Sequence, residues 1–362
     1  MSVNQTYHIW FQWLKQLWPH ESQPTVRNAA WFITGVFESH SVQLPAIARK
    51  IPSRAKLPSR VQRLARFLKG STWRVRPSYA PLAKTLLQDL AHTLGEIRLI
   101  ADGSRVAFHH QLLLISVAYR RRAVPIAWTW IPSARGHSSA WRQLALLAYV
   151  RSLLPPDVPI SLIGDTEFEA ATVQDQVAAW GWFFALRQKP NNLVRRTPHD
   201  PWQSFGSLVP HPGASVWWPN AELTAQHQRR VNLWAYWRVG EKVPWLVATN
   251  LPTAQATRRT YRRRMWTEEL FGDLKGHGFD LESTHLRHFE RLSRLTLLVV
   301  LLYVWMLWVG VRTIKRGERH WVDRHDRRDL SVFQIGWRFL DRFITNGDPL
   351  PNALKPMDLL KL

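Results

Sequence analysis

Three acidic residues, Asp102, Asp165 and Glu268, have a placement that suits metal-assisted chemistry. Asp102 directly follows a short buried strand predicted over residues 97–101, and Asp165 follows another over residues 160–163. Because strand ends hold side chains on a rigid base, two carboxylates at neighbouring strand ends could share a metal ion. Each aspartate also has an ordinary structural interpretation. Asp-Gly at the first site is a common turn signal, and Asp165 could cap the helix that follows it.

The third carboxylate lies in a predicted helix, from about residue 257 to residue 275, in which four polar residues share one face. The four residues are Tyr261, Arg264, Glu268 and Lys275, at offsets of three, seven and fourteen from the first. At about 100° per residue, they fall within an arc about 60° wide. Glu269 would lie about 80° from Tyr261 on the other side, so the helix geometry favours Glu268 over its neighbour. An ordinary solvated helix face remains the alternative.

These positions resemble the signature of a large family of bacterial insertion-sequence transposases of the DDE type. Residues 261–268, Tyr-Arg-Arg-Arg-Met-Trp-Thr-Glu, followed by Lys275, fit the Tyr-(2)-Arg-(3)-Glu-(6)-Lys pattern of that family. Asp102 within Ile-Ala-Asp-Gly-Ser and Asp165 within Ile-Gly-Asp-Thr-Glu resemble its first and second carboxylate motifs. The resemblance covers about residues 59–311. It implies a ribonuclease H-like core in which a β insertion separates the second aspartate from the glutamate.

The resemblance implies that Asp102, Asp165 and Glu268 are catalytic residues that bind two divalent metal ions per active site. Two ions roughly 4 Å apart assist in-line displacement at a phosphodiester by activating the attacking oxygen and stabilising the leaving oxygen. Hard oxygen ligands suit Mg²⁺, for which Mn²⁺ can substitute. Asp102 would bridge both ions, and Asp165 and Glu268 would each complete one.

The same family implies that Tyr261, Arg264 and Lys275 contact DNA phosphates beside the scissile end. A hydroxyl donor, a guanidinium and an ammonium group suit that task, since phosphate contacts hold the backbone in register. Trp245, in the run Pro-Trp-Leu-Val-Ala-Thr-Asn, resembles a tryptophan that receives a flipped base in hairpin-forming members. With 21 tryptophans in the chain, packing inside a β-rich segment is the alternative for Trp245.

The elements that must position these residues change character along the chain. Residues 1–93 are predicted to be an all-helical DNA-binding region. Residues 94–187 and 253–315 predict an α/β core of the ribonuclease H type, with three consecutive strands followed by helix, strand, helix and strand. Aromatic and apolar runs separated by Pro, Gly and Asn predict a β-rich insertion over residues 188–252. Residues 316–362 are expected to form a basic, loosely ordered C-terminal tail.

The charge balance of the chain points to a polyanionic partner. Among 362 residues, 49 Lys and Arg exceed 26 Asp and Glu, which gives a formal charge of +23. Contacts of Lys and Arg with nucleic acid release condensed counterions and favour binding at moderate salt. There is no cysteine, which excludes disulfide scaffolds and thiolate zinc sites. No targeting segment is found, and the expected location is the cytoplasm of a bacterium, at the nucleoid.

One apolar run, residues 295–311, carries no formal charge and is just long enough to span a bilayer. A buried helix in a large core has the same composition, and we expect that rather than a membrane partner.

Together these features predict a DNA transposase that binds terminal inverted repeats, cuts there and joins the 3′ ends to target DNA, as a homodimer that holds both ends. The alternatives are a structure-selective nuclease on the same fold and a non-catalytic DNA-binding protein derived from a transposase.

Overall fold

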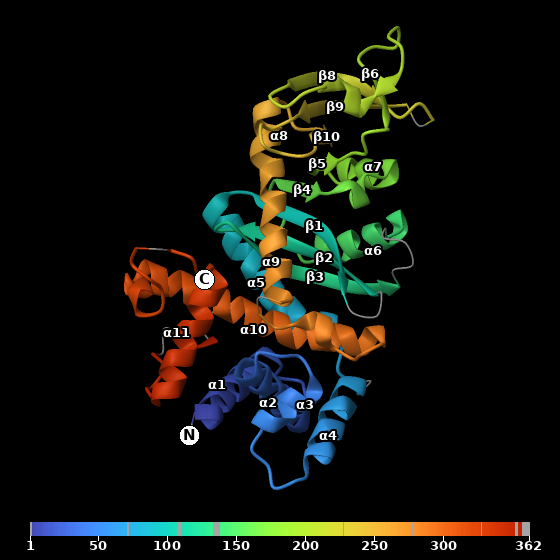
Figure 1. Ribbon diagram of the computed structural model, residues 1–362. Helices are drawn as coiled ribbons and strands as arrows, with labels where there is room; N and C mark the ends of the chain where they lie inside the picture. The colour runs from blue at the N-terminus through green and yellow to red at the C-terminus, as the bar shows by residue number, and fades with distance from the viewer. Residues whose placement is uncertain are drawn as a thin grey trace. The chain divides into compact units, whose positions relative to one another are not determined.

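The apolar runs that precede Asp102 and Asp165 form strands of one mixed sheet in the computed structural model of the chain (Figure 1). The structure describes residues 2–70, 72–106, 110–132, 138–226, 228–276, 278–326, 328–351 and 354–356. The chain forms two units. The helical unit comprises Met1–Leu86, Val106–His110 and Phe271–Leu362, and the sheet unit comprises Leu87–Arg105 and Gln111–Leu270.

The sheet contains ten strands among the described residues, in the order β3-β2-β1-β4-β5-β10-β9-β8-β6-β7. Its first five strands in sequence are β1 (Ile97–Val106), β2 (His110–Tyr119), β3 (Arg122–Pro132), β4 (Ile160–Gly164) and β5 (Phe183–Arg187). Its other strands are β6 (Leu193–Arg195), β7 (Gln203–Ser204), β8 (Ser215–Leu223), β9 (Arg229–Tyr236) and β10 (Trp245–Thr249). The predicted mixed α/β class is therefore confirmed.

Strands β1, β4 and β5 are parallel neighbours at the centre of the sheet. Ile97 pairs with Ile160 at one end of the β1–β4 ladder and Ala101 with Gly164 at the other. β4 is buried along its whole length, Ser161 included, as expected of a strand covered on both faces. On the other side of β1, β2 and β3 are joined through Arg120 and Arg121, which both have positive φ angles of 44° and 64°. Two such residues form the tight turn that matches strand twist in a hairpin.

The segment predicted to be a β-rich insertion extends the same sheet. β10 pairs antiparallel with β5, and β9 and β8 follow it, also antiparallel. β-branched and aromatic residues favour these strands, because such side chains pack well on a pleated surface. The central sheet therefore continues without a break into residues 188–252.

Helices of the sheet unit pack on these strands. α6 (Ala140–Arg151) contacts β3, α7 (Ala171–Ala179) contacts β5, and α8 (Ala254–Tyr261) lies over β4 and β5 (Figure 1). The single helix predicted from about residue 257 to residue 275 is interrupted. α8 passes into the 3₁₀ segment η4 (Arg262–Met265), and α9 (Trp266–Leu274) follows. A 3₁₀ turn advances about 120° per residue, so η4 rotates the later residues by roughly 80° relative to a continuous α-helix.

The helical unit is built around a long apolar helix. Its helices are α1 (Ser2–Leu17), α2 (Gln23–Ser39), α3 (Leu44–Lys50), α4 (Leu57–Lys69), the beginning of α5 (Val75–Leu94), α10 (Phe289–Lys315) and α11 (Val332–Asn346). Among the described helices, α10 alone is long and apolar enough to cross a membrane, and 83% of its most apolar stretch is buried inside the protein. α2, α4 and α11 pack against it. Gly310 of α10 and Gly336 of α11 meet so closely that an added Cβ would lie 2.0 Å and 1.9 Å from backbone oxygens.

The expectation of a loosely ordered tail after residue 315 is wrong for residues 332–346, which form α11. Ser331 and Gln334 form a capping box at its start, and Gly347 adopts a left-handed conformation at its end. Phe333, Trp337, Leu340 and Ile344 repeat at the spacing of one helical face and are buried, which is what fixes the helix. The domain boundaries expected from the sequence stay predictions.

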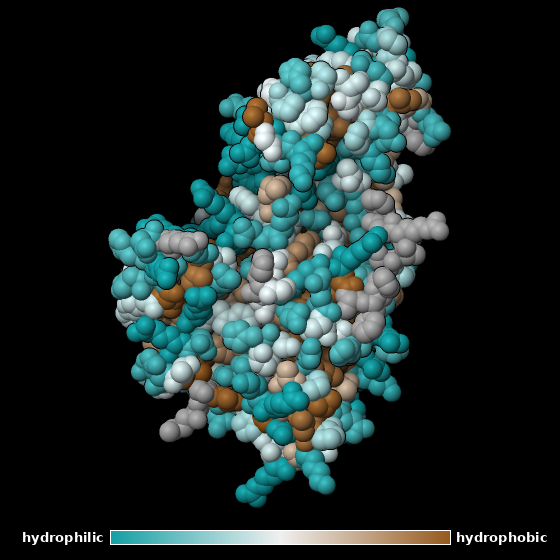
Figure 2. Space-filling model, viewed as in Figure 1, coloured by the Kyte–Doolittle hydropathy of each residue, from teal (hydrophilic) through white to brown (hydrophobic). Residues whose placement is uncertain are grey.

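On the face shown in Figure 2, hydrophilic residues predominate and hydrophobic residues form small separate patches.

Candidate active site

The structure brings Asp102 and Asp165 to the same level of two neighbouring strands. Each follows the last residue of the register between β1 and β4, in which Ala101 is opposite Gly164. The parallel direction of these strands places both side chains on the same face of the sheet. Asp102 is 6% exposed, and Asp165 is half-buried.

Asp102 lies inside β1 and not in the turn that Asp-Gly suggests, because β1 continues to Val106. Gly103 is required for another reason. A Cβ at Gly103 would lie 2.3 Å from Glu167 Oε2 and 2.6 Å from Gln111 Nε2. The glycine therefore permits a close approach of two polar side chains behind Asp102.

Asp165 does cap the segment that follows it. It is the N-cap of the 3₁₀ segment η2 (Thr166–Phe168), and its Oδ1 accepts a hydrogen bond from the Glu167 backbone N–H at 2.9 Å. The cap fixes the carboxylate at the end of β4, so a structural role and a chemical role are compatible here.

Burial and, to a smaller extent, the nearby charge of Asp165 raise the pKa of Asp102 from its ordinary value to about 6. Hydrogen bonds from Thr267 Oγ1 at 2.5 Å and from the Gly103 N–H at 2.8 Å oppose this shift, as does the charge of Arg264. Two carboxylates this close in a buried setting are short of positive charge.

Arg264 connects the first carboxylate with the third. Its Nη2 donates to Glu268 Oε1 at 2.7 Å, and its Nη1 lies 3.7 Å from Asp102 Oδ2. The neighbouring glutamate has a different partner, since Glu269 pairs with Arg122 at 3.5 Å. The side chains of Glu268 and Glu269 are almost equally exposed, at 52% and 53%. The choice of Glu268 therefore rests on its link through Arg264 and not on burial.

The polar stripe expected on one helix is divided in the structure. Tyr261 is buried, and its hydroxyl has no hydrogen-bond partner within the part of the chain that the structure describes. Burial raises the pKa of Tyr261. Trp245 packs edge-on against Tyr261 at 5.3 Å between ring centroids and also contacts Trp234, so the two predicted residues meet. Lys275 belongs to the helical unit, where its ammonium group pairs with Glu282 at 2.8 Å.

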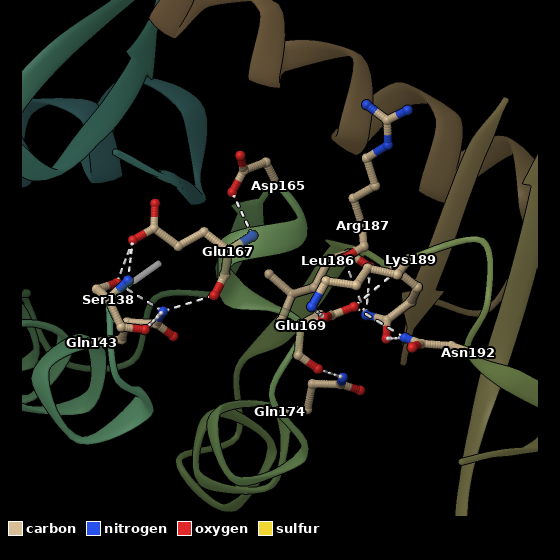
Figure 3. Close-up of polar contacts among 11 residues, drawn as sticks. Ser138, Gln143, Asp165, Glu167, Glu169, Gln174, Leu186, Arg187, Lys189 and Asn192 are labelled. Carbon is tan, nitrogen blue, oxygen red and sulfur yellow. Dashed lines mark hydrogen bonds and ion pairs between the residues drawn. The ribbon is translucent and has the colours of Figure 1, made fainter. Parts of the chain in front are cut away.

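A buried polar network that sequence reasoning missed supports the Asp165 segment (Figure 3). Glu167 Oε1 accepts hydrogen bonds from the backbone N–H and the Oγ of Ser138 at 2.8 and 2.5 Å. Gln111 Nε2 donates to both Glu167 oxygens at 2.8 Å. Gln143 Nε2 donates to the Glu167 backbone oxygen at 2.7 Å. Glu167 thus links β2, the Ser138 segment before α6 and the Asp165 cap. An acid two residues after Asp165 was the available signal.

The donor set suits a hard divalent cation, because Asp102, Asp165 and Glu268 offer only carboxylate oxygens. Among the described residues, no three acidic or histidine side chains are already grouped as metal ligands. Asp102 and Asp165 form a pair, and Arg264 holds Glu268 beside it. Burial and the neighbouring charge of Asp165 both raise the pKa of Asp102, and a bound cation would offset both effects. The residues therefore fit a metal site in which a cation supplies the compensating charge.

Comparison with known proteins covers part of this site. Residues 135–305, which include Asp165 and Glu268, match the family described as "Transposase DDE domain". Asp102 lies before the match, and its assignment rests on the strand register. No curated protein matches the chain. A solved structure described as the cryo-EM structure of a piggyBac transposase synaptic complex with hairpin DNA is 8% identical, with a TM-score of 0.45. The alignment covers 98% of this chain and 82% of that chain.

Proposed function

We propose that this chain, with its match to the transposase DDE domain, is a DNA transposase that cuts at terminal inverted repeats and joins the freed 3′ ends to target DNA. The observation that carries the proposal is the pairing of Asp102 with Asp165 at one register level, with Glu268 joined to Asp102 through Arg264. The signature Tyr-(2)-Arg-(3)-Glu-(6)-Lys supports assignment to the insertion-sequence group. The strand order β3-β2-β1-β4-β5 supports a ribonuclease H-like core.

In this function Asp102, Asp165 and Glu268 would hold two divalent ions, Mg²⁺ or Mn²⁺. Such ions activate the attacking oxygen and stabilise the leaving oxygen of the phosphodiester. The chain itself supplies the positioning. Thr267 and the Gly103 N–H orient Asp102, and the Glu167 network holds Asp165.

DNA is the proposed partner, and the charge of +23 supports it. Arg264, Tyr261 and Lys275 are proposed to contact backbone phosphates near the scissile end. A guanidinium matches a phosphate in a bidentate geometry, which makes Arg264 the principal contact. Trp245 is proposed to stack on an extruded base. The N-terminal helices would bind the terminal repeats, a homodimer would hold two ends, and the location would be bacterial cytoplasm at the nucleoid.

The test compares Glu268 with its neighbour. Asp102→Ala, Asp165→Ala and Glu268→Gln should each abolish Mg²⁺-dependent cleavage and joining of duplexes that carry the repeats flanking the gene. Glu269→Gln is the matched control, since its side chain has the same exposure and also pairs with an arginine. Cleavage that survives all three substitutions would refute the catalytic assignment.

The product distinguishes the alternatives. Joining of a cut 3′ end to a second duplex supports a transposase, whereas cleavage without joining indicates a structure-selective nuclease. DNA binding with neither reaction indicates a non-catalytic protein derived from a transposase.

A further inference from the structure

A second group of charged residues lines a pocket of the sheet unit at the opposite end of the parallel strands. Arg98 of β1 is in register with Ser161 of β4, and Ser161 is in register with Phe183 of β5. These three residues therefore form one row across three adjacent strands, facing the same side of the sheet. They line a pocket of about 290 Å³.

The other wall of the pocket is one face of α8 and η4. Ala256, Arg259, Thr260 and Arg263 line it, at offsets of three, four and seven, which is the spacing of neighbouring residues on a helix. α8 lies over β4 and β5, so this face is turned toward the row of strand residues. Three arginines, from β1, α8 and η4, thus line one small space.

The lining residues of the pocket have a net positive charge, since three arginines face one carboxylate. Glu96 is the one carboxylate among its lining residues, and it forms an ion pair with Arg98. Burial, together with the charges of Arg263 and Arg259, lowers the pKa of Arg98 to about 10. Burial and neighbouring arginines also lower the pKa of Arg263. Guanidinium groups that repel one another in a partly buried space are stabilised by a bound anion.

We propose that this pocket binds a backbone phosphate of the DNA on which the chain acts, through Arg98, Arg259 and Arg263. That the anion is DNA rests on the proposed function. The volume of the pocket is at the lower end of the range for ligand pockets, which suits a single phosphate group better than a base and sugar. Arginine forks match phosphate oxygens in pairs, and Arg259 is exposed at the mouth of the pocket.

The position of the pocket relates it to the carboxylates. Arg98 and Asp102 lie four residues apart on β1, and Ser161 and Asp165 lie four apart on β4. Both pairs keep to one face of the sheet, because four is an even number of strand residues. At about 3.3 Å per residue, the pocket lies about 13 Å along the strands from the carboxylate pair. One strand of B-form DNA rises about 3.4 Å per nucleotide, so this distance corresponds to about four nucleotides. The pocket would fix the register of the DNA relative to the scissile phosphate.

Glu96 makes the proposal testable in both directions. In the free protein Glu96 forms an ion pair with Arg98, and a phosphate must compete with Glu96 for this guanidinium. Glu96→Gln should therefore strengthen DNA binding, on the order of threefold for one partly exposed charge. Arg98→Gln combined with Arg259→Gln should weaken binding and reduce the slope of log K against log salt by about one unit, the loss of one phosphate contact.

The experiment measures binding of the full chain to a repeat-containing duplex by fluorescence anisotropy, in EDTA and over a series of salt concentrations. Arg151→Gln is the control, because Arg151 is an exposed arginine of the same unit whose guanidinium lies over the Trp180 ring, outside the pocket. The control should leave affinity and slope unchanged. Titration of inorganic phosphate by calorimetry tests the second source of the same chemistry.

Weaker binding with a reduced slope in the arginine variant, together with tighter binding in Glu96→Gln, supports the proposal. Unchanged DNA affinity and slope in both variants overturns it. If the arginine variant loses only the binding of inorganic phosphate and keeps its DNA affinity, the pocket binds a free anion and the DNA assignment is wrong. The binding assay contains no divalent metal, so it can be interpreted even if the protein proves to have no cleavage activity. Conversely, unchanged DNA binding in the pocket variants would not affect the result of the cleavage test on the carboxylate variants.

Discussion

Replacing Asp102 with Asn should stabilise the metal-free protein and abolish cleavage. In the absence of metal, ionised Asp102 is buried beside Asp165, and this arrangement raises its pKa to about 6 from 3.8. A raised pKa means that the folded protein holds the ionised group at a cost. An asparagine has nearly the same shape and carries no charge, so it removes that cost.

The shift sets both the size and the pH range of the effect. At 1.36 kcal/mol per pKa unit, it corresponds to about 3 kcal/mol of unfolding free energy. Below pH 3.8, Asp102 is protonated in the folded and unfolded states, and the parent protein bears no penalty. Between pH 3.8 and 6 the unfolded chain loses its proton first, so the penalty grows, and it is complete above pH 6. The stabilising effect of Asp102→Asn should therefore rise through this window.

Thermal unfolding in EDTA at pH 4.5 and pH 7.5 measures the effect. At pH 7.5 the melting temperature of Asp102→Asn should exceed that of the parent by about 5 °C, and the difference should shrink at pH 4.5. Asp157→Asn is the control, because Asp157 is exposed in the same unit and asparagine tolerates its φ of 56°. Added Mg²⁺ should stabilise the parent more than the variant. A variant that melts below the parent at pH 7.5 in EDTA would refute the electrostatic reasoning.

Three further substitutions test the surroundings of the carboxylates. Gly103→Ala places a Cβ against Glu167 and should lower the unfolding free energy by about 2 kcal/mol, measured by urea denaturation, while unchanged stability would contradict the close approach. Glu167→Gln replaces a carboxylate oxygen with an NH₂ donor that faces other donors, so single-turnover cleavage should slow about tenfold with DNA affinity retained; loss of affinity instead would point to a DNA contact. Tyr261→Phe removes a buried hydroxyl without a partner among the described residues. Its melting temperature should hold or rise while DNA affinity falls, and a lower melting temperature would show that the hydroxyl stabilises the fold.

The central strands and the two aspartates could be predicted from the sequence because each feature is local. β4 is a short run with three apolar residues, Ile160, Leu162 and Ile163, directly before Gly164 and Asp165, and this composition identifies it as a buried strand. Asp-Gly at residue 102 misleads for a tertiary reason. The glycine normally signals a turn, but here it makes room for Glu167, which lies far along the chain. Only the fold reveals that neighbour.

The helix that carries Glu268 shows the limit of periodicity. A uniform 100° per residue cannot anticipate η4, whose tighter turn changes which residues face the sheet. As a result, Thr267 reaches Asp102, although no pattern in the sequence distinguished it. Hydrogen-bond partners such as Ser138 and Gln143 are equally invisible, because their meeting depends on how α6 and η2 pack.

The local charge around the carboxylates runs against the charge of the whole chain. In a protein with a formal charge of +23, a group of acids is unexpected at a site proposed to face DNA, since each one repels phosphate. Yet Asp102, Asp165 and Glu268 share Arg264 as the cation that contacts two of them. Burial raises the pKa of Asp102, the charge of Asp165 raises it further, and Arg264 offsets only part of this excess of negative charge. Packing does not require this excess, whereas divalent cations that bridge carboxylate and phosphate would turn it into attraction for DNA.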